Sequence, residues 1–176
     1  MAFQDATVCN TDLLQSAKYI FSIPRLTSTQ FFCQTVNVPG ISMGFKEQPT
    51  PFSDLRIPGD KLNYEDLTIQ FLLDEELYSW ISIHDWIRGI TFPVEFDEYN
   101  NLKHLSRFSE ISTFPQYADA ELITLSANNQ QKVKFHFYEL FPVSISGFTM
   151  DIKVGSEATM TASATFKYKR FDIVKI

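Results

Sequence analysis

The sequence predicts an α+β fold that is mainly antiparallel β-sheet, with one amphipathic helix packed against it. Three observations support this prediction. Short runs of alternating apolar and polar residues recur along the chain, separated by clusters of Pro, Gly, Asn and Ser. Only one segment carries apolar residues at helical spacing. The 17 phenylalanines are typical of a core or an interface built from large flat side chains.

The composition excludes several classes of protein. A chain of 176 residues, 44% hydrophobic and 20% charged, is expected to fold as a single domain over residues 1–176. Its net charge of −6 and pI near 5.0 argue against a general nucleic-acid binder, which needs a basic face. The N-terminus lacks the pattern of a signal peptide, and no apolar stretch is long enough to span a bilayer. Cys9 and Cys33 match no zinc or redox spacing.

The first third of the chain predicts an arm, two strands and a protrusion. Residues 1–16 are polar and mixed, as in an N-terminal arm, and residues 18–23 and 30–36 are rich in β-formers. Residues 41–60 hold three prolines and two glycines among short extended pieces, which indicates a protruding hairpin or extended loop. Such a segment buries little and is uncommon inside a compact domain, so we expect it to be functional.

A strand followed by a helix is predicted next. Alternating apolar residues over 67–73 give a strand one buried face. We expect the helix to cover residues 74–89, with Asp74 as its N-cap and two glutamates in its first turn. Trp80 and Trp86 lie on the apolar stripe and would anchor the helix. Gly89 would end it, and Pro93 bars its continuation.

The second half of the chain predicts an irregular insertion and then more strands. Residues 94–118 show no periodicity but contain several aromatic anchors. The strands that we expect cover residues 120–127, 132–140, 146–154 and 158–173. We expect Phe141 and Pro142 to break the second of these strands.

The acidic cluster at the helix start is the first candidate for an enzyme site. Asp74, Glu75, Glu76, His84 and Asp85 are the residues concerned. A metal or acid–base site needs side chains that converge on one point, but the acids at 74 and 75 lie nearly three helical turns from His84. Helix capping explains their position better. His104 and His136 are isolated, and none of the common catalytic motifs is present, so we expect no enzyme, no metal and no cofactor.

The last predicted strand carries a row of hydroxyl groups. Thr161, Ser163 and Thr165 share one face of it, and small apolar residues occupy the other face. This pattern suits a sheet that faces an aqueous space. An ordinary solvent-facing sheet explains the pattern equally well.

In order and pattern, these segments resemble the tail tube proteins of contractile-tailed bacteriophages. Five segments carry the resemblance. They are QFFCQTVNVPGIS (residues 30–42), FKEQPTPFSDLRIPGD (45–60), YEDLTIQFLLDEELYSWISIHDW (64–86), KVKFHFYELFPVSI (132–145) and TMTASATFKYKRF (159–171). None is specific alone, but the five occur in the expected order at about the expected spacing. Residues 94–118 are longer and more aromatic than the connection expected in a plain tube subunit.

The resemblance implies a tail-tube fold of two packed sheets flanked by the helix, in a virion protein made in the host cytoplasm. Subunits would form hexameric rings that stack, with sheet edges joined around a lumen that DNA crosses only as cargo. Neighbouring partners would be sheath, baseplate or tube-end proteins, with no membrane. Thr161, Ser163 and Thr165 are candidates to face the lumen, where an acidic balance discourages phosphate contacts.

The protrusion at residues 41–60 would then reach the next ring. The polar residues that we expect to make inter-ring contacts are Lys46, Glu47, Asp54, Arg56 and Asp60. One alternative on the same fold is a tail completion, terminator or baseplate tube-initiator protein. The alternative of another class is a small β-barrel that binds an apolar ligand; it predicts a monomer with an internal cavity and a short, ordered loop at residues 41–60.

Overall fold

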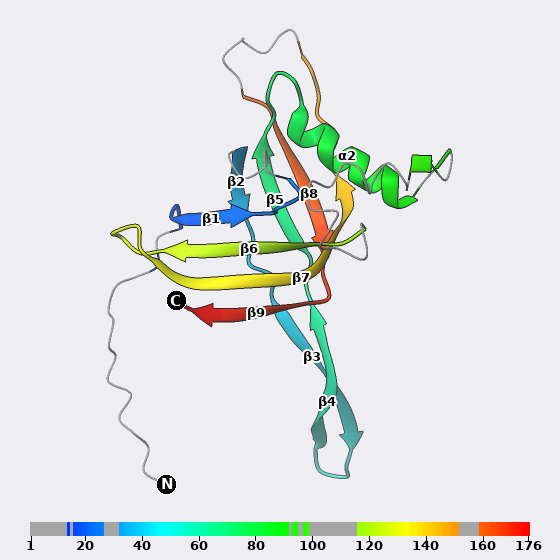
Figure 1. The fold of residues 1–176 in the computed structure, drawn as a ribbon. Helices are drawn as coiled ribbons and strands as arrows, with labels where there is room; N and C mark the ends of the chain where they lie inside the picture. Colours follow the sequence, from blue (N-terminus) through cyan, green and yellow to red (C-terminus); the bar gives the residue numbers. More distant parts are fainter. Residues whose placement is uncertain are drawn as a thin grey trace.

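The computed structural model describes residues 14, 16–26, 32–91, 93–94, 97–98, 116–151 and 159–176 (Figure 1). The predicted arm at 1–16 and the predicted insertion at 94–118 lie almost entirely outside these residues. The described strands are β1 (Tyr19–Ser22), β2 (Cys33–Val36), β3 (Ile41–Pro49), β4 (Asp54–Tyr64), β5 (Leu67–Leu72), β6 (Ala118–Leu125), β7 (Gln131–Ile145), β8 (Thr161–Lys167) and β9 (Arg170–Lys175). The helix is α2 (Tyr78–Thr91).

The strands form two packed layers and a separate hairpin. Sheet A has the order β1-β6-β7-β9, and sheet B has the order β2-β5-β8-β7, because the long strand β7 belongs to both. Every pairing is antiparallel, and the strands of the two sheets cross in Figure 1. Strands β3 and β4 form a two-stranded sheet of their own. Within the described residues the predicted fold class is confirmed: mainly antiparallel β, with two packed sheets flanked by helix α2.

The core lies between the two sheets and under α2. Leu67, Ile69 and Phe71 of β5 are fully buried, as the alternation predicts. Trp86 on α2 is 1% exposed, and its ring centroid lies 6.2 Å from that of Phe166 on β8. Its indole Nε1 donates to the carbonyl oxygen of Gln116 at 3.1 Å, so the one polar atom of this side chain is satisfied. No helix within the described ranges is long and apolar enough to cross a membrane.

The helix is shifted along the sequence relative to its prediction. It begins at Tyr78, not at Asp74, because the N–H of Leu77 donates to the carbonyl oxygen of Asp74 at 3.0 Å and closes a turn first. Leu77 has a φ of 54°, a conformation that stops the helix from extending backwards. The two glutamates therefore precede the helix, whose first turn holds no acid. At the other end the helix runs past the buried Gly89 to Thr91.

Strand β7 continues through the predicted break at residues 141 and 142. Glu139 has a φ of 52°, and its N–H donates to Oδ1 of Asp119 at 3.1 Å, which bends the strand at this point. Beyond the bend β7 leaves sheet A and pairs with β8. Pro142 is tolerated because the pairing register shifts between Pro142 and Ser144, where a ladder hydrogen bond is lost in any case.

The predicted final strand, residues 158–173, is divided into two. Strand β8 lies in sheet B, and β9 lies in sheet A beside β7. Phe166 and Phe171 are both buried although an odd number of positions separates them. Since one strand cannot turn both inward, the chain must change direction between them. The described part of the predicted strand at 146–154, residues 146–151, is not in a strand, and residues 152–158 lie outside the described residues.

Candidate assembly interface

The β3–β4 hairpin projects away from the sandwich and is exposed on both faces (Figure 1). Every residue of β3 is exposed, as is every residue of β4 except Gly59 and Tyr64. A two-stranded hairpin is marginally stable in water without a packing partner. No described residue of the sandwich covers the outer part of this hairpin. Its geometry therefore fits a docking element better than an element of the core.

One face of the hairpin is apolar in the half that lies nearer the sandwich. Ile41, Met43 and Phe45 alternate along β3, and their side chains are 51%, 54% and 62% exposed. The residues opposite them on β4 are Tyr64, Leu62 and Pro58. Exposed apolar surface of this extent in one stripe marks a site of interaction with another macromolecule.

The predicted inter-ring residues all lie exposed on the hairpin. Glu47 and Arg56 are opposite each other and form an ion pair, with Nε 3.3 Å from Oε1. The Arg56 guanidinium also lies 5.7 Å from the centroid of the Phe45 ring. Among the described residues, none forms an ion pair with Lys46, Asp54 or Asp60. Two of the five residues thus contact each other, and three present unpaired charge at the surface.

The base of the hairpin is clamped to the sandwich by residues on both sides of it. Oδ1 of Asn37 accepts from the N–H of Thr68 at 2.6 Å. The Gly40 N–H donates to the Glu65 carboxylate at 3.1 Å, where a Cβ on Gly40 would approach this carboxylate to 2.8 Å. The Tyr168 hydroxyl donates to the carbonyl oxygen of Glu65 at 2.9 Å, and burial raises the pKa of Tyr168 to about 12. These contacts fix the direction in which the hairpin leaves the domain.

The hairpin contains a bulge between Gly44 and Gly59. The register shifts between Met43 and Phe45, so the two glycine backbones face each other closely. A Cβ on Gly59 would lie 2.6 Å from the carbonyl oxygen of Gly44, whereas a Cβ on Gly44 would meet nothing within 4 Å. Only Gly59 is therefore required as glycine by this close approach.

The outer face of sheet B carries the predicted row of hydroxyl groups. Thr161, Ser163 and Thr165 alternate with the buried Ala162, Ala164 and Phe166 along β8. Gln70 on the neighbouring β5 donates from Nε2 to Oγ1 of Thr161 at 3.3 Å. Strand β8 thus has the predicted alternation, with a hydroxyl-rich face that ends at Lys167, which is paired with Asp66 at 3.7 Å. Whether this face lines a lumen stays a prediction.

Sheet B has two edges that no described strand pairs with. One edge is β2, and the other is the end of β7 at residues 141–145. The four strands alternate in direction, so these two edges run antiparallel to each other. Copies of the domain related by rotation can therefore join β2 to the end of β7 and continue the antiparallel pattern.

The capping and anchoring residues have structural contacts. Oδ2 of Asp74 accepts from the N–H of Tyr78 at 3.3 Å, so Asp74 caps the helix from the preceding turn. The Trp80 ring stacks on His84 at 5.3 Å, and its Nε1 donates to the carbonyl oxygen of Ser146 at 3.1 Å. Nδ1 of His84 lies 3.2 Å from Oδ1 of Asp85. Within the described ranges, no group of three or more potential ligands could hold a metal ion.

Several residues that shape this surface were not found from the sequence. Asn37 and Thr68 are 31 positions apart, and the sequence contains no signal that they meet. The position of Tyr168 at the hairpin base was also missed, because one strand was expected there. The pair Gly44 and Gly59 did carry a signal, since two glycines within a β-rich segment indicate a bulge.

Comparisons with known proteins agree on one family. Residues 14–174 match the family described as phage tail tube protein. The tail tube terminator protein of Enterobacteria phage T4 is 25% identical over 166 residues, which cover 91% of this chain and 88% of that protein.

Two solved structures share the fold over nearly their whole length. One is the tube-terminating cap of the anti-feeding prophage, with a TM-score of 0.64, 12% identity and coverage of 98% of this chain and 100% of that one. The other is from the sheath–tube complex of an extracellular contractile injection system, PVC, in the extended state. Its TM-score is 0.61, with 12% identity and coverage of 99% and 100%.

Proposed function

The chain belongs to the phage tail tube protein family, and from this membership we propose that it forms the ring that terminates a phage tail tube. The family predicted by resemblance is thereby confirmed, and with it a place in the phage tail. The observation that carries the proposal is the similarity to the phage T4 tail tube terminator over nearly the full length of both chains. The shared fold with the anti-feeding prophage cap supports it. The role is structural and requires no catalysis.

In this proposal six copies form a ring through the edges of sheet B. Strand β2 of one subunit pairs with residues 141–145 of the next, which removes two exposed edges from each subunit. The hydroxyl face with Thr161, Ser163 and Thr165 then faces the lumen. This wall is rich in hydroxyls, and Lys167 at the end of the row lies 3.7 Å from the Asp66 carboxylate. It therefore offers little unpaired positive charge to phosphate, and DNA passes as cargo without being retained.

The hairpin contacts the neighbouring ring of the tube. Its apolar face supplies the buried area, and the exposed charges of Lys46, Asp54 and Asp60 elsewhere on the hairpin supply polar contacts that fix the orientation. The clamped base supports this role, because a docking element with a fixed direction loses less freedom on binding. Other partners are tail proteins at the end of the tube, such as the sheath terminator.

A repeating tube subunit is the second candidate. The chain from the PVC sheath–tube complex superimposes on nearly all of this chain, with a TM-score of 0.61 against 0.64 for the cap. The apolar-ligand alternative predicts a short, ordered loop at residues 41–60. The exposed hairpin observed there does not fit that expectation.

Light scattering on a sizing column, with negative-stain microscopy of the purified chain, tests the proposal. A terminator gives single six-fold rings that do not elongate at high concentration. Long stacks of rings would favour the tube subunit instead. A stable monomer that binds hydrophobic dyes would contradict both.

A further inference from the structure

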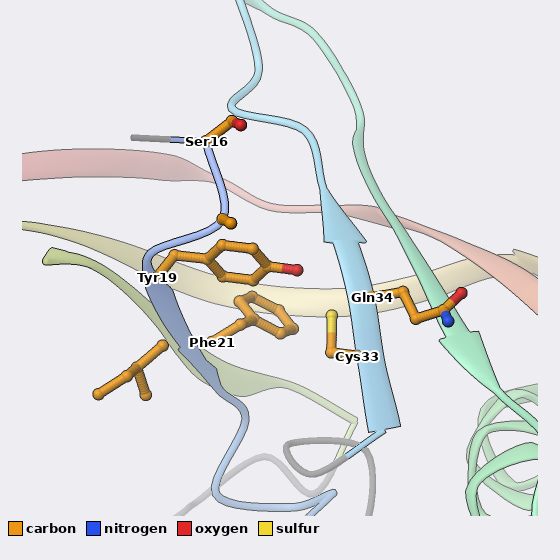
Figure 2. A pocket seen from close by; sticks show the side chains of 7 residues that line it. Ser16, Tyr19, Phe21, Cys33 and Gln34 are labelled. Carbon is orange, nitrogen blue, oxygen red and sulfur yellow. The ribbon is translucent and has the colours of Figure 1, made fainter. Parts of the chain in front are cut away.

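An open groove separates β1 from β2, the two strands at the ends of the sheet path (Figure 2). It has a volume of about 510 Å³. Strand β1 pairs only with β6, and β2 pairs only with β5, so within the described residues the groove lies between two free strand edges. In Figure 2 the side chains of Tyr19, Phe21 and Cys33 converge in the groove, whereas Gln34 points away from it.

The wall of the groove is of mixed polarity and carries no formal charge. Seven residues line it, and none is ionised at neutral pH: Ser16, Ala17, Tyr19, Ile20, Phe21, Cys33 and Gln34. Burial raises the pKa of the Cys33 thiol to about 11, so the thiol is neutral. Burial and the neighbouring Cys33 also raise the pKa of Tyr19. Where Tyr19, Phe21 and Cys33 converge, the groove presents two aromatic rings and a neutral thiol, and these suit an apolar side chain.

The other free edge of sheet B offers such a side chain. Pro142 pairs with Phe166 and Ser144 pairs with Thr165, which leaves Val143 as the extra residue of a bulge with no partner on β8. Val143 is 47% exposed. Because β2 and the end of β7 run antiparallel, ring closure through these edges brings Val143 of one copy beside β2 of the next.

We propose that Val143 of a second copy of this chain packs in the groove formed by Tyr19, Phe21 and Cys33. The inference rests on the proposed ring and specifies where its subunits meet. The contact uses main-chain pairing along β2 together with one apolar side chain in a preformed groove. It explains why the Val143 side chain is exposed at this edge of sheet B, although the adjacent Pro142 and its partner Phe166 are buried.

Cross-linking tests the contact directly, because Cys33 is already in the groove. Val143→Cys is introduced in a Cys9→Ser background, and the assembled protein is oxidised with copper phenanthroline. We expect a ladder of disulfide-linked species up to the size of the ring on a non-reducing gel. The same variant with Cys33→Ser should give no ladder. Phe52→Cys at the hairpin tip, with Cys33 retained, should also give none, since this position is fully exposed and far from the groove.

A matched pair of charge variants gives a second readout. Val143→Asp should shift ring assembly to at least about tenfold higher protein concentration, because it places a carboxylate against two aromatic rings and a thiol, in a groove whose lining holds no cation. Val174→Asp is the control, since Val174 is 50% exposed on β9 and lies outside the groove. It should assemble like the parent chain.

The outcomes separate the contact from the proposed function. Rings of normal size without a Cys33-dependent ladder would overturn the contact and leave the terminator role standing. Equal assembly of the Val143→Asp and Val174→Asp variants would do the same. If the parent chain forms no ring at any concentration, the proposed function and this contact both fail.

Discussion

The sandwich and the β3–β4 hairpin use the same sequence pattern but have opposite environments. Leu67, Ile69 and Phe71 alternate along β5 and are fully buried. Ile41, Met43 and Phe45 alternate with the same period along β3 and are more than half exposed. The difference lies in what covers each face: sheet A and α2 cover β5, and nothing in the described chain covers the outer part of the hairpin. Alternation therefore identifies the apolar face of a strand, but not the chain that buries it.

This contrast predicts that substitutions in the sandwich lower the stability of the fold, whereas substitutions in the hairpin weaken assembly. The largest effect is expected for Trp86→Ala in the core. Loss of a buried indole next to Phe166 should lower the free energy of unfolding by about 3–5 kcal/mol. Urea denaturation of the purified chain measures it. Tyr78→Ala, which truncates an exposed aromatic at the start of α2, should leave it nearly unchanged. Equal losses would contradict the assignment of Trp86 to the core.

The two glycines of the hairpin bulge test whether hairpin shape affects assembly without affecting the stability of the sandwich. Gly59→Ala forces a Cβ against the Gly44 carbonyl oxygen, so the strands must separate or the bulge must rearrange. We expect loss of co-sedimentation with cognate tail tubes, while the unfolding midpoint of the sandwich stays nearly unchanged. Gly44→Ala is the matched control, because its Cβ meets open space, and it should co-sediment normally. The same behaviour in both variants would show that the bulge does not determine docking.

The clamp at the hairpin base connects the two regions and should have a smaller effect. Asn37→Ala removes the acceptor for the Thr68 N–H, at a cost of about 1 kcal/mol. Hydrogen exchange should show faster exchange at Thr68 and at the base of the hairpin, with the core amides unaffected. Asn63→Ala, an exposed asparagine on β4, should leave exchange unchanged. Uniformly faster exchange across the sandwich after Asn37→Ala would refute a local clamp.

The smallest effect concerns charge on the outer face of sheet A. The hydrogen bond from Lys134 lowers the pKa of Glu121, and the nearby His136 lowers it further. The ionised carboxylate therefore stabilises the fold above the pKa of Glu121 in the unfolded chain, and this contribution is lost as pH falls through the lowered value. Glu121→Gln should flatten the acid side of the stability profile by less than about 1 kcal/mol, since the side chain is partly exposed. An unchanged pH profile would show that the Glu121–Lys134 pair contributes nothing to stability.

The sequence was sufficient for features that depend on local pattern. Alternation located β5 and the buried face of β8, and prolines and glycines marked the protrusion at residues 41–60. Asp74 is only partly as predicted: its carboxylate accepts from the N–H of Tyr78 at the helix start, but a backbone turn from Asp74 to Leu77 separates it from the first helical residue. The turn forms first here, and Leu77 adopts a positive φ.

Features that depend on distant pairing could not be predicted. The division of the last strand requires knowing that Phe166 and Phe171 face the core from different sheets. Likewise, the passage of β7 through Pro142 follows from β8 being present at its side. The edges of sheet B and the groove between β1 and β2 exist only once the strand order is known. Local periodicity contains no information on that order.

The central claim is that the apolar face of the hairpin serves assembly rather than folding. The double substitution Met43→Ser and Phe45→Ser tests it most directly, with unfolding and tube co-sedimentation measured on the same preparation. We predict a free energy of unfolding within about 0.5 kcal/mol of the parent chain, because both side chains are more than half exposed. Tube binding should weaken at least about tenfold, because two large apolar side chains are removed from the contact. A variant that loses several kcal/mol of stability, or that binds tubes as well as the parent chain, would contradict the claim.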